Sequence, residues 1–261
     1  MEIVGYVLAI LIGVTLGLIG GGGSILTVPI LVYLFGLKPE MATSYSLFIV
    51  GITALFGTYR HYIIGNLNVK IALTFAIPSV LSLLLVRKFL LPIVPDILFS
   101  INDFVITKQN LIMIIFSFLM ISASFSMIKS SKSESKFEKI NYKNLFLIGI
   151  LVGFVTGFLG AGGGFLIIPA LIYFAGLHMK QAVGTSLFII FINSMIGFLG
   201  DVIHGYSFNY VLLLSISAIA LVGMFIGTQL SKRIEGGKLK PAFGWFVLVM
   251  GIYIILKELF K

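Results

Sequence analysis

The sequence predicts an all-α integral membrane protein made of two inverted repeats, each a glycine-turn helical hairpin plus three transmembrane helices. Of its 261 residues, 59% are hydrophobic and only 10% are charged, so polar groups are too few to cover a water-soluble globule. Apolar stretches of about 17 to 25 residues recur, the length that an α-helix needs to cross a bilayer. The alternation typical of a membrane β-barrel is not visible.

The third observation is an internal duplication, because residues 17 to 57 recur at 157 to 197 without a gap. The first copy begins GLIGGGGSILTVPILVYLFGLKPEMATSYSLF and the second GFLGAGGGFLIIPALIYFAGLHMKQAVGTSLF. The coinciding residues are Gly20/Gly160, Gly22/Gly162, Gly23/Gly163, Pro29/Pro169, Tyr33/Tyr173, Gly36/Gly176 and Ser46/Ser186. In an apolar chain, glycine-interrupted segments at corresponding places in two halves indicate a transporter's substrate site.

The apolar pattern predicts about ten helical segments, five in each half of the chain. The segments expected in the first half are residues 3–19, 24–36, 39–64, 68–90 and 108–129. Those expected in the second half are residues 143–159, 164–176, 179–203, 208–232 and 240–259. The predicted organisation is a first repeat (1–128), a polar cytoplasmic linker (129–142) and a second repeat (143–261). A connection at 91–104 holds two prolines and has no counterpart in the second half.

The orientation follows from which segments are long enough to cross. Segments 24–36 and 164–176 reach only about 20 Å as helices, so each pairs with its predecessor as a hairpin that returns to the same side. One hairpin and three spans make an odd number of crossings, and the repeats must therefore be inverted. With the linker inside, about twelve of the lysines and arginines are cytoplasmic and six external, which favours external termini. Arg87 and Lys88 oppose this bias.

Composition also restricts the function. The net charge of +9 comes from lysines and arginines in short connections, which indicates topology signals and lipid contacts rather than nucleic-acid binding. Because the chain has no cysteine, disulfides, thiol catalysis and cysteine metal sites are excluded. Its start lacks the features of a cleaved signal peptide. Three scattered histidines and nine acidic residues form no catalytic or metal cluster, so no cofactor, metal or catalytic residue is predicted.

The two glycine runs predict an anion-binding site. Consecutive glycines form helices poorly, so the chain is expected to open there, and open backbone inside a membrane must line protein or water. Helices that begin after these turns would direct N–H groups and a positive dipole end into the opening, where an anion fits. The predicted binding residues are Gly20, Gly21, Gly22, Gly23, Ser24, Gly160, Gly162, Gly163 and Gly164. The alternative is close helix packing, which scattered glycines such as Gly13 and Gly153 fit.

Neutral polar side chains one helix further on complete the candidate site. The hydroxyls of Ser46, Thr185 and Ser186 lie in the duplicated A-x-x-x-S-L-F stretch, and Asn193 replaces Thr53 of the first copy. Hydroxyl groups bind an oxyanion without trapping it by full charge. The alternative is that such hydroxyls bond their own helix backbone, as Ser and Thr commonly do.

Ionisable residues near the membrane are few, which gives each one functional interest. Arg60 and His61 correspond to Gly200 and Asp201, and His204 follows three residues after Asp201. Asp201 with His204 is a candidate proton relay, and Arg60 a candidate anion attractor at a cytoplasmic mouth. The alternative is that these side chains simply reach the polar interface from helix ends.

The duplicated G-[LF]-[IL]-G-x-G-G-[GS] run, the following Pro, Tyr and Gly-Leu, and the A-x-x-x-S-L-F stretch resemble the sulfite exporter TauE/SafE family of membrane transporters. The resemblance covers about residues 5 to 258. It implies a multi-pass protein of the plasma membrane that transports small sulfur-containing anions such as sulfite, thiosulfate or sulfonates, with protons as a coupling ion. Alternating access is the mechanism expected of inverted repeats. A passive anion channel and an intramembrane enzyme are the alternatives.

Overall fold

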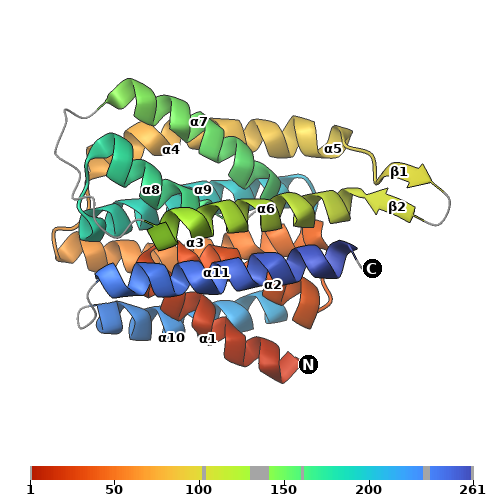
Figure 1. Ribbon diagram of the computed structural model, residues 1–261, viewed down its shortest axis with the longest axis horizontal. Coiled ribbons are helices and arrows are strands. Elements are labelled where there is room, and N and C mark those ends of the chain that lie inside the picture. Colours follow the sequence, from red (N-terminus) through yellow and green to blue (C-terminus); the bar gives the residue numbers. More distant parts are fainter. Residues whose placement is uncertain (1, 102–103, 130–140, 160–161, 232–235, 260–261) are drawn as a thin grey trace.

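The computed structural model describes residues 2–101, 104–129, 141–159, 162–231 and 236–259, and nearly all of these residues form one bundle of helices (Figure 1). In the first repeat, α1 (Glu2–Ile19) and α2 (Gly22–Leu34) form a hairpin, and α3 (Pro39–Ile63) follows. The next helix consists of α4 (Val69–Leu85), the π-helical turn η1 (Val86–Leu90) and α5 (Leu91–Ile93). Two antiparallel strands, β1 (Ile97–Ile101) and β2 (Phe104–Thr107), lead into α6 (Lys108–Lys129).

The second repeat has the same order of elements without the strands. It contains the hairpin α7 (Tyr142–Leu159) and α8 (Gly164–Ala175), followed by α9 (Met179–Ile203), α10 (Tyr210–Ser231) and α11 (Gly236–Leu259). The predicted helices are confirmed, with ends within four residues of those expected. The prolines of the 91–104 connection were noted, but its strands were not predicted. The β-branched and aromatic residues of β1 and β2 favour this conformation.

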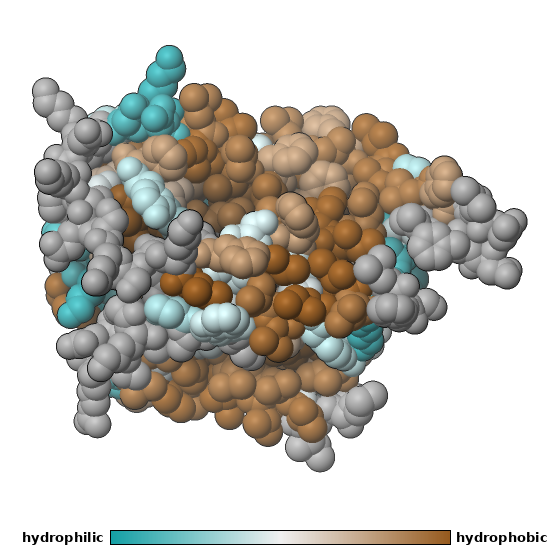
Figure 2. All heavy atoms as spheres, in the orientation of Figure 1, coloured by the Kyte–Doolittle hydropathy of each residue, from teal (hydrophilic) through white to brown (hydrophobic). Residues whose placement is uncertain are grey.

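The surface of the bundle fits a hydrocarbon environment. Within the described residues, α3, the α4–α5 helix, α7, α9 and α10 are long and apolar enough to cross a membrane. Hydrophobic residues dominate the face in Figure 2. On α4, for example, exposed Leu73, Ile77, Leu81 and Leu85 recur every fourth residue and make one continuous apolar stripe. Such a stripe is unfavourable in water but suits lipid. Together with the five candidate spans, it identifies a multi-pass membrane protein.

The two repeats run in opposite directions through the bundle. Helices α3 and α9 correspond in the duplication, and they pack against each other. Near the start of α3, Ser44 shares its partner Arg87 with Asp201 near the end of α9. At the other end, a Cβ on Gly184 of α9 would lie 2.8 Å from the Cβ of His61 in α3. Because equivalent helices lie antiparallel, the repeats are inverted, as the count of crossings predicted.

Two of the external cations in the predicted orientation are not solvated charges. Arg87 is 8% exposed and bound to Asp201, and Lys108 is 7% exposed and lies 3.0 Å from the Glu40 carboxylate. The positive-inside rule counts charges in short flanking loops, so a cation paired within the bundle adds little to it. The two termini and the β1–β2 hairpin lie at one end of the bundle (Figure 1).

Glycines hold each hairpin's first arm close to a spanning helix of the opposite repeat. On α7, a Cβ at Gly149 would lie 2.7 Å from the carbonyl oxygen of Phe75 in α4, and Gly153 abuts the backbone of Ser79. In the other repeat, Gly13 and Gly17 of α1 abut the backbone of α10 in the same manner. The predicted packing role of the scattered glycines is confirmed at Gly13, Gly149 and Gly153, because small residues let membrane helices approach closely.

We expect Gly153→Leu to lower the free energy of unfolding by at least about 1–3 kcal/mol, because the new side chain collides with the α4 backbone. The measurement is reversible denaturation of the purified protein in micelles. Phe154→Leu is the matched control, since Phe154 is an exposed neighbour on the same helix. Equal stability of the two variants would contradict the close α4–α7 contact.

Candidate functional site

A glycine turn separates the two arms of each hairpin. In the first, Gly20 has a φ of +77° and only Gly20 and Gly21 are non-helical. Gly22 and Gly23 already belong to α2, so the opening is shorter than the four-glycine run predicted. In the second, Gly162 and Gly163 have φ values of +63° and +70°, a conformation that favours glycine. Gly160 lies outside the described residues, as does the side chain of Ser24.

The turns of the two hairpins meet inside the bundle, although they come from opposite repeats. A Cβ on Gly164 would lie 2.5 Å from the Cα of Gly21 and 2.6 Å from the Cδ1 of Ile190. Real Cβ atoms do not approach other atoms so closely, so only glycine fits this position. The structure therefore brings together the two segments that the duplication marked.

Each turn also contacts the polar face of α9. The hydroxyl of Ser186 lies 3.1 Å from the carbonyl oxygen of Gly20 and 2.8 Å from that of Val183 in its own helix, so its one proton is shared between these two acceptors. A Cβ on Gly162 would lie 2.9 Å from the Oγ of Ser194 and 3.2 Å from Val50 of α3. The second turn thus lies between the two equivalent central helices, and the first turn lies against the other repeat.

The central helices α3 and α9 each carry a buried polar face along their length. Ser46, Thr53 and His61 follow at intervals of seven and eight residues on α3, which returns to the same side of a helix. Ser186, Asn193 and Asp201 occupy the equivalent positions on α9. Because the repeats are inverted, the faces end at opposite ends of the bundle, in His61 on one side and Asp201 on the other.

Several polar atoms on these faces are buried and unpartnered among the described residues. They are the hydroxyl oxygens of Ser46 and Ser194, the Oδ1 of Asn193 and the Nδ1 of His61. The Nδ2 of Asn193 donates a 2.7 Å hydrogen bond to Ser79 of α4. A buried polar group without a partner is costly, so such groups in a native fold call for a functional explanation.

Three of the predicted binding residues have other partners. The hydroxyl of Thr185 accepts a hydrogen bond from the backbone N–H of Asn68, at the start of α4. Gly23 and Gly163 face the first arms of their own hairpins, where they abut Ile12 and Thr156. Their missing side chains therefore allow the arms of each hairpin to approach closely and do not face the opposite repeat.

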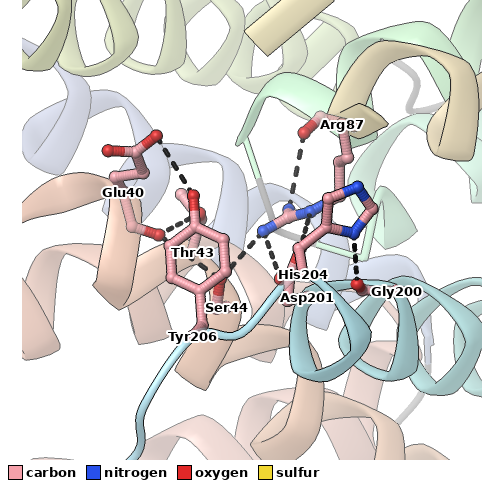
Figure 3. A network of polar contacts seen from close by, with 9 residues as sticks. Glu40, Thr43, Ser44, Arg87, Gly200, Asp201, His204 and Tyr206 are labelled. Atoms are coloured by element: carbon pink, nitrogen blue, oxygen red, sulfur yellow. Dashed lines mark hydrogen bonds and ion pairs between the residues drawn. The ribbon is translucent and has the colours of Figure 1, made fainter. Parts of the chain in front are cut away.

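A buried ion pair lies at one end of the central helices, the end that the predicted orientation makes external (Figure 3). Arg87 on η1 donates from Nε to Asp201 at 2.7 Å and from NH2 to the second carboxylate oxygen at 2.5 Å. The guanidinium also donates to Ser44 of α3 at 2.9 Å and to the carbonyl oxygen of Gly157 of α7 at 3.4 Å. Four helical elements from both repeats therefore converge on one cation.

A second polar cluster lies beside this pair. The carboxylate of Glu40 accepts from Lys108 at 3.0 Å and from the Tyr206 hydroxyl at 3.3 Å. Burial, and then the Glu40 carboxylate, raise the pKa of Tyr206, so its phenol stays protonated and remains a donor. Glu40 and Lys108 also line a pocket of about 340 Å³ with Asp96 and Thr107. This end of the bundle is therefore polar and hollowed.

Asp201 and His204, the candidate proton relay, each bind another partner in the structure. His204 comes directly after α9, is exposed and contacts the carbonyl oxygen of Gly200, while Asp201 binds Arg87. A spacing of three residues favours one helix face, but His204 follows the last residue of α9 and Asp201 points inward to a stronger partner. Arg60 is half-buried with its guanidinium 5.9 Å from the Phe225 ring, and the neighbouring His61 is buried.

Sequence reasoning missed Arg87. Its only signal was its position at the end of a long apolar segment on the side that the positive-inside rule disfavours. A cation in such a place is a functional candidate by default, because isolated charges are expensive there. Its partner Asp201 lies 114 residues away, and no local pattern joins the two.

Inverted repeats, opposed glycine turns and buried polar faces define the class, which is a membrane transporter. The chain belongs to the sulfite exporter TauE/SafE family, whose model matches residues 6–254. A probable membrane transporter protein of Xylella fastidiosa is 29% identical, over 95% of this chain and 92% of the relative. The probable membrane transporter protein YdhB of Bacillus subtilis is 24% identical, over 94% of this chain and 96% of the relative.

Removing one member of the buried ion pair should destabilise the protein more than removing both. Arg87→Met leaves the Asp201 carboxylate buried without a cation, and we expect a loss of about 3–5 kcal/mol in the free energy of unfolding. Adding Asp201→Leu removes that charge and should recover most of the loss. Denaturation in micelles measures both variants, with Lys88→Met, at the exposed neighbouring cation, as the control. A double variant less stable than the single one would refute this account.

Proposed function

We propose that this protein is a secondary transporter of small sulfur-containing oxyanions in the cell membrane, and that the anion binds where the two glycine turns meet α3 and α9. The observation that carries the proposal is the set of unpartnered hydroxyls, Ser46 and Ser194, on the faces that adjoin these turns. The family's name supplies the substrate class, and the geometry supports an anion of that kind.

The donors in this region suit a bound oxyanion that must also leave. Each hydroxyl offers an O–H group, and a hydrogen bond to a charged acceptor contributes about 1.5–3 kcal/mol. Helices α2 and α8 begin at the turns with glycine N-caps, whose lack of a side chain leaves no competing capping group. Their positive dipole ends favour an anion without supplying a full opposing charge.

Alternating access is the mechanism that this arrangement favours. Contacts between the repeats are present at both ends of the central helices. The Arg87–Asp201 pair joins the repeats at one end, and at the other Gly184 packs against His61 and the carbonyl oxygen of Asn66. Rocking one repeat against the other would break one of these contacts and keep the other. A channel would instead need both ends open at once.

The direct test is uptake of labelled sulfite, thiosulfate and methanesulfonate by liposomes that contain the purified protein. We expect saturable flux of at least one of these anions. Flux that rises linearly with anion concentration and is faster than the turnover of a transporter would favour a passive anion channel. Absence of flux of every sulfur anion, in protein shown to be folded, would overturn the proposed substrate class.

Gly162→Ala should reduce transport at least about tenfold. The new methyl group would lie 2.9 Å from the Ser194 hydroxyl and 3.2 Å from Val50, and so would occupy the space at the second turn. Gly205→Ala is the matched control, because Gly205 also has a positive φ, of +86°, but faces open space. Both variants carry the same kind of backbone strain. Equal flux in the two would remove the second turn from the site.

Ser194→Ala should raise the KM for the anion about tenfold and leave the maximal rate nearly unchanged. The reason is loss of one hydrogen bond to a charged group, at about 1.5–3 kcal/mol. Thr228→Ser serves as the control on α10, where a buried hydroxyl bonds its own helix backbone. A KM unaffected by Ser194→Ala would show that this hydroxyl does not contact the substrate.

A further inference from the structure

The buried guanidinium of Arg87 binds acceptors of three kinds, of which one can be neutralised by a proton. Two of its donors bind the carboxylate of Asp201, one binds a serine hydroxyl and one a backbone carbonyl. Of these acceptors, only Asp201 is charged, and only its charge can be removed by a proton. A planar guanidinium fork fits the oxygens of a sulfonate or sulfite as well as those of a carboxylate.

The position of Asp201 strengthens this observation. Asp201 terminates the polar face of α9, which also carries Asn193 and the unpartnered Ser194. Ser194 lies two helical turns before Asp201, which is about 10 Å along the helix axis. The equivalent residue on α3 is His61, which terminates the other face at the opposite end. Each of the two polar faces thus ends in one titratable side chain, and of the two only Asp201 forms an ion pair among the described residues.

We propose that Arg87 and Asp201 form a proton-for-anion exchange site, in which protonation of Asp201 releases the Arg87 guanidinium to bind the incoming oxyanion. This inference rests on the proposed function and adds a second binding residue and the residue that takes up the proton. One proton neutralises the Asp201 carboxylate, and one monoanion takes its place on the cation. The charge of the site is the same before and after the exchange, so no uncompensated charge is left buried.

The neighbouring charged and polar groups are compatible with this exchange. Ser44 of α3 remains a partner of Arg87 throughout, and the Gly157 carbonyl of α7 adds no titration. Tyr206, in the loop after α9, is held protonated beside Glu40, and the charge of Glu40 is matched by Lys108. His204 is exposed and bonded to the α9 backbone. Asp201 is therefore the titratable group in direct contact with Arg87.

A binding experiment separates exchange from a purely structural ion pair. The probe is methanesulfonate, whose charge does not change between pH 5 and 8, measured by calorimetry on the purified protein. We expect wild-type affinity to fall about tenfold or more as the pH rises through this range. Asp201→Asn should bind tightly at every pH, and Arg87→Gln added to it should abolish that gain.

Asp201→Glu keeps a titratable carboxylate and should therefore keep the pH dependence. This variant is the control for misfolding of Asp201→Asn. A structural pair would give the opposite pattern, in which Asp201→Asn weakens binding and leaves the pH dependence intact. That outcome would overturn the exchange site.

A second readout requires no transport and no known substrate. The natural chain has no cysteine, so Ser194→Cys introduces a single thiol inward of the ion pair. In intact cells, a membrane-impermeant thiol reagent should label this cysteine slowly at pH 8, and at least about fivefold faster at pH 5.5 after correction for the reagent's own pH dependence. Adding Asp201→Asn should give the fast rate at both pH values. Ser207→Cys, in the exposed loop after α9, is the control for reagent access.

The two readouts keep this inference distinct from the proposed function. One outcome is flux of sulfur anions with a labelling rate that changes neither with pH nor with Asp201→Asn. It would overturn the exchange site and leave the proposed transport function supported. Faster labelling in Asp201→Asn without flux of any sulfur anion would support release of the Arg87–Asp201 pair. The same result would overturn the proposed substrate class.

Discussion

The structure depends on one constraint, which is that backbone N–H and C=O groups inside a bilayer must find partners within the protein. A helical hairpin that turns inside the membrane breaks this rule at its tip, and the tip is tolerated only where other protein surrounds it. Here the Gly20 carbonyl receives the Ser186 hydroxyl, and Gly164 packs directly on Gly21. The first hairpin tip is therefore enclosed by the other repeat, and the second tip lies between α3 of the other repeat and α9 of its own.

Inversion follows from the same constraint and shapes the site. A tip that enters from one side is best met by a second tip that enters from the other, and this requires the equivalent helices α3 and α9 to lie antiparallel. One ancestral polar face then becomes two faces that lead to opposite ends. The divergence of one position, His61 in the first copy and Asp201 in the second, makes the two ends chemically different although the backbone arrangement is shared.

Much of this architecture could be predicted because its signals are local in the sequence. Helix length, the 140-residue repeat and the glycine runs gave the hairpins, the spans and their inversion. The polar contacts could not be predicted in the same way. Thr185 and Ser186 are adjacent in the chain, yet one bonds the start of α4 and the other the first glycine turn. The Arg87–Asp201 pair joins residues 114 positions apart, and the nearer His204 was chosen as partner by spacing alone.

The difference between the two ends bears on how the conformational cycle is driven. At the end with Gly184, the contact between the repeats consists of Gly184 against the Asn66 backbone and the Cβ of His61, without an ion pair between these residues. Opening the end with Asp201 requires the separation of a buried guanidinium from a carboxylate, and an unpaired buried charge costs several kcal/mol. In the proposed exchange site, a proton on Asp201 and an anion on Arg87 would together lower that cost, because each neutralises one of the separated charges. On this proposal, the energetic control of transport belongs at the Asp201 end.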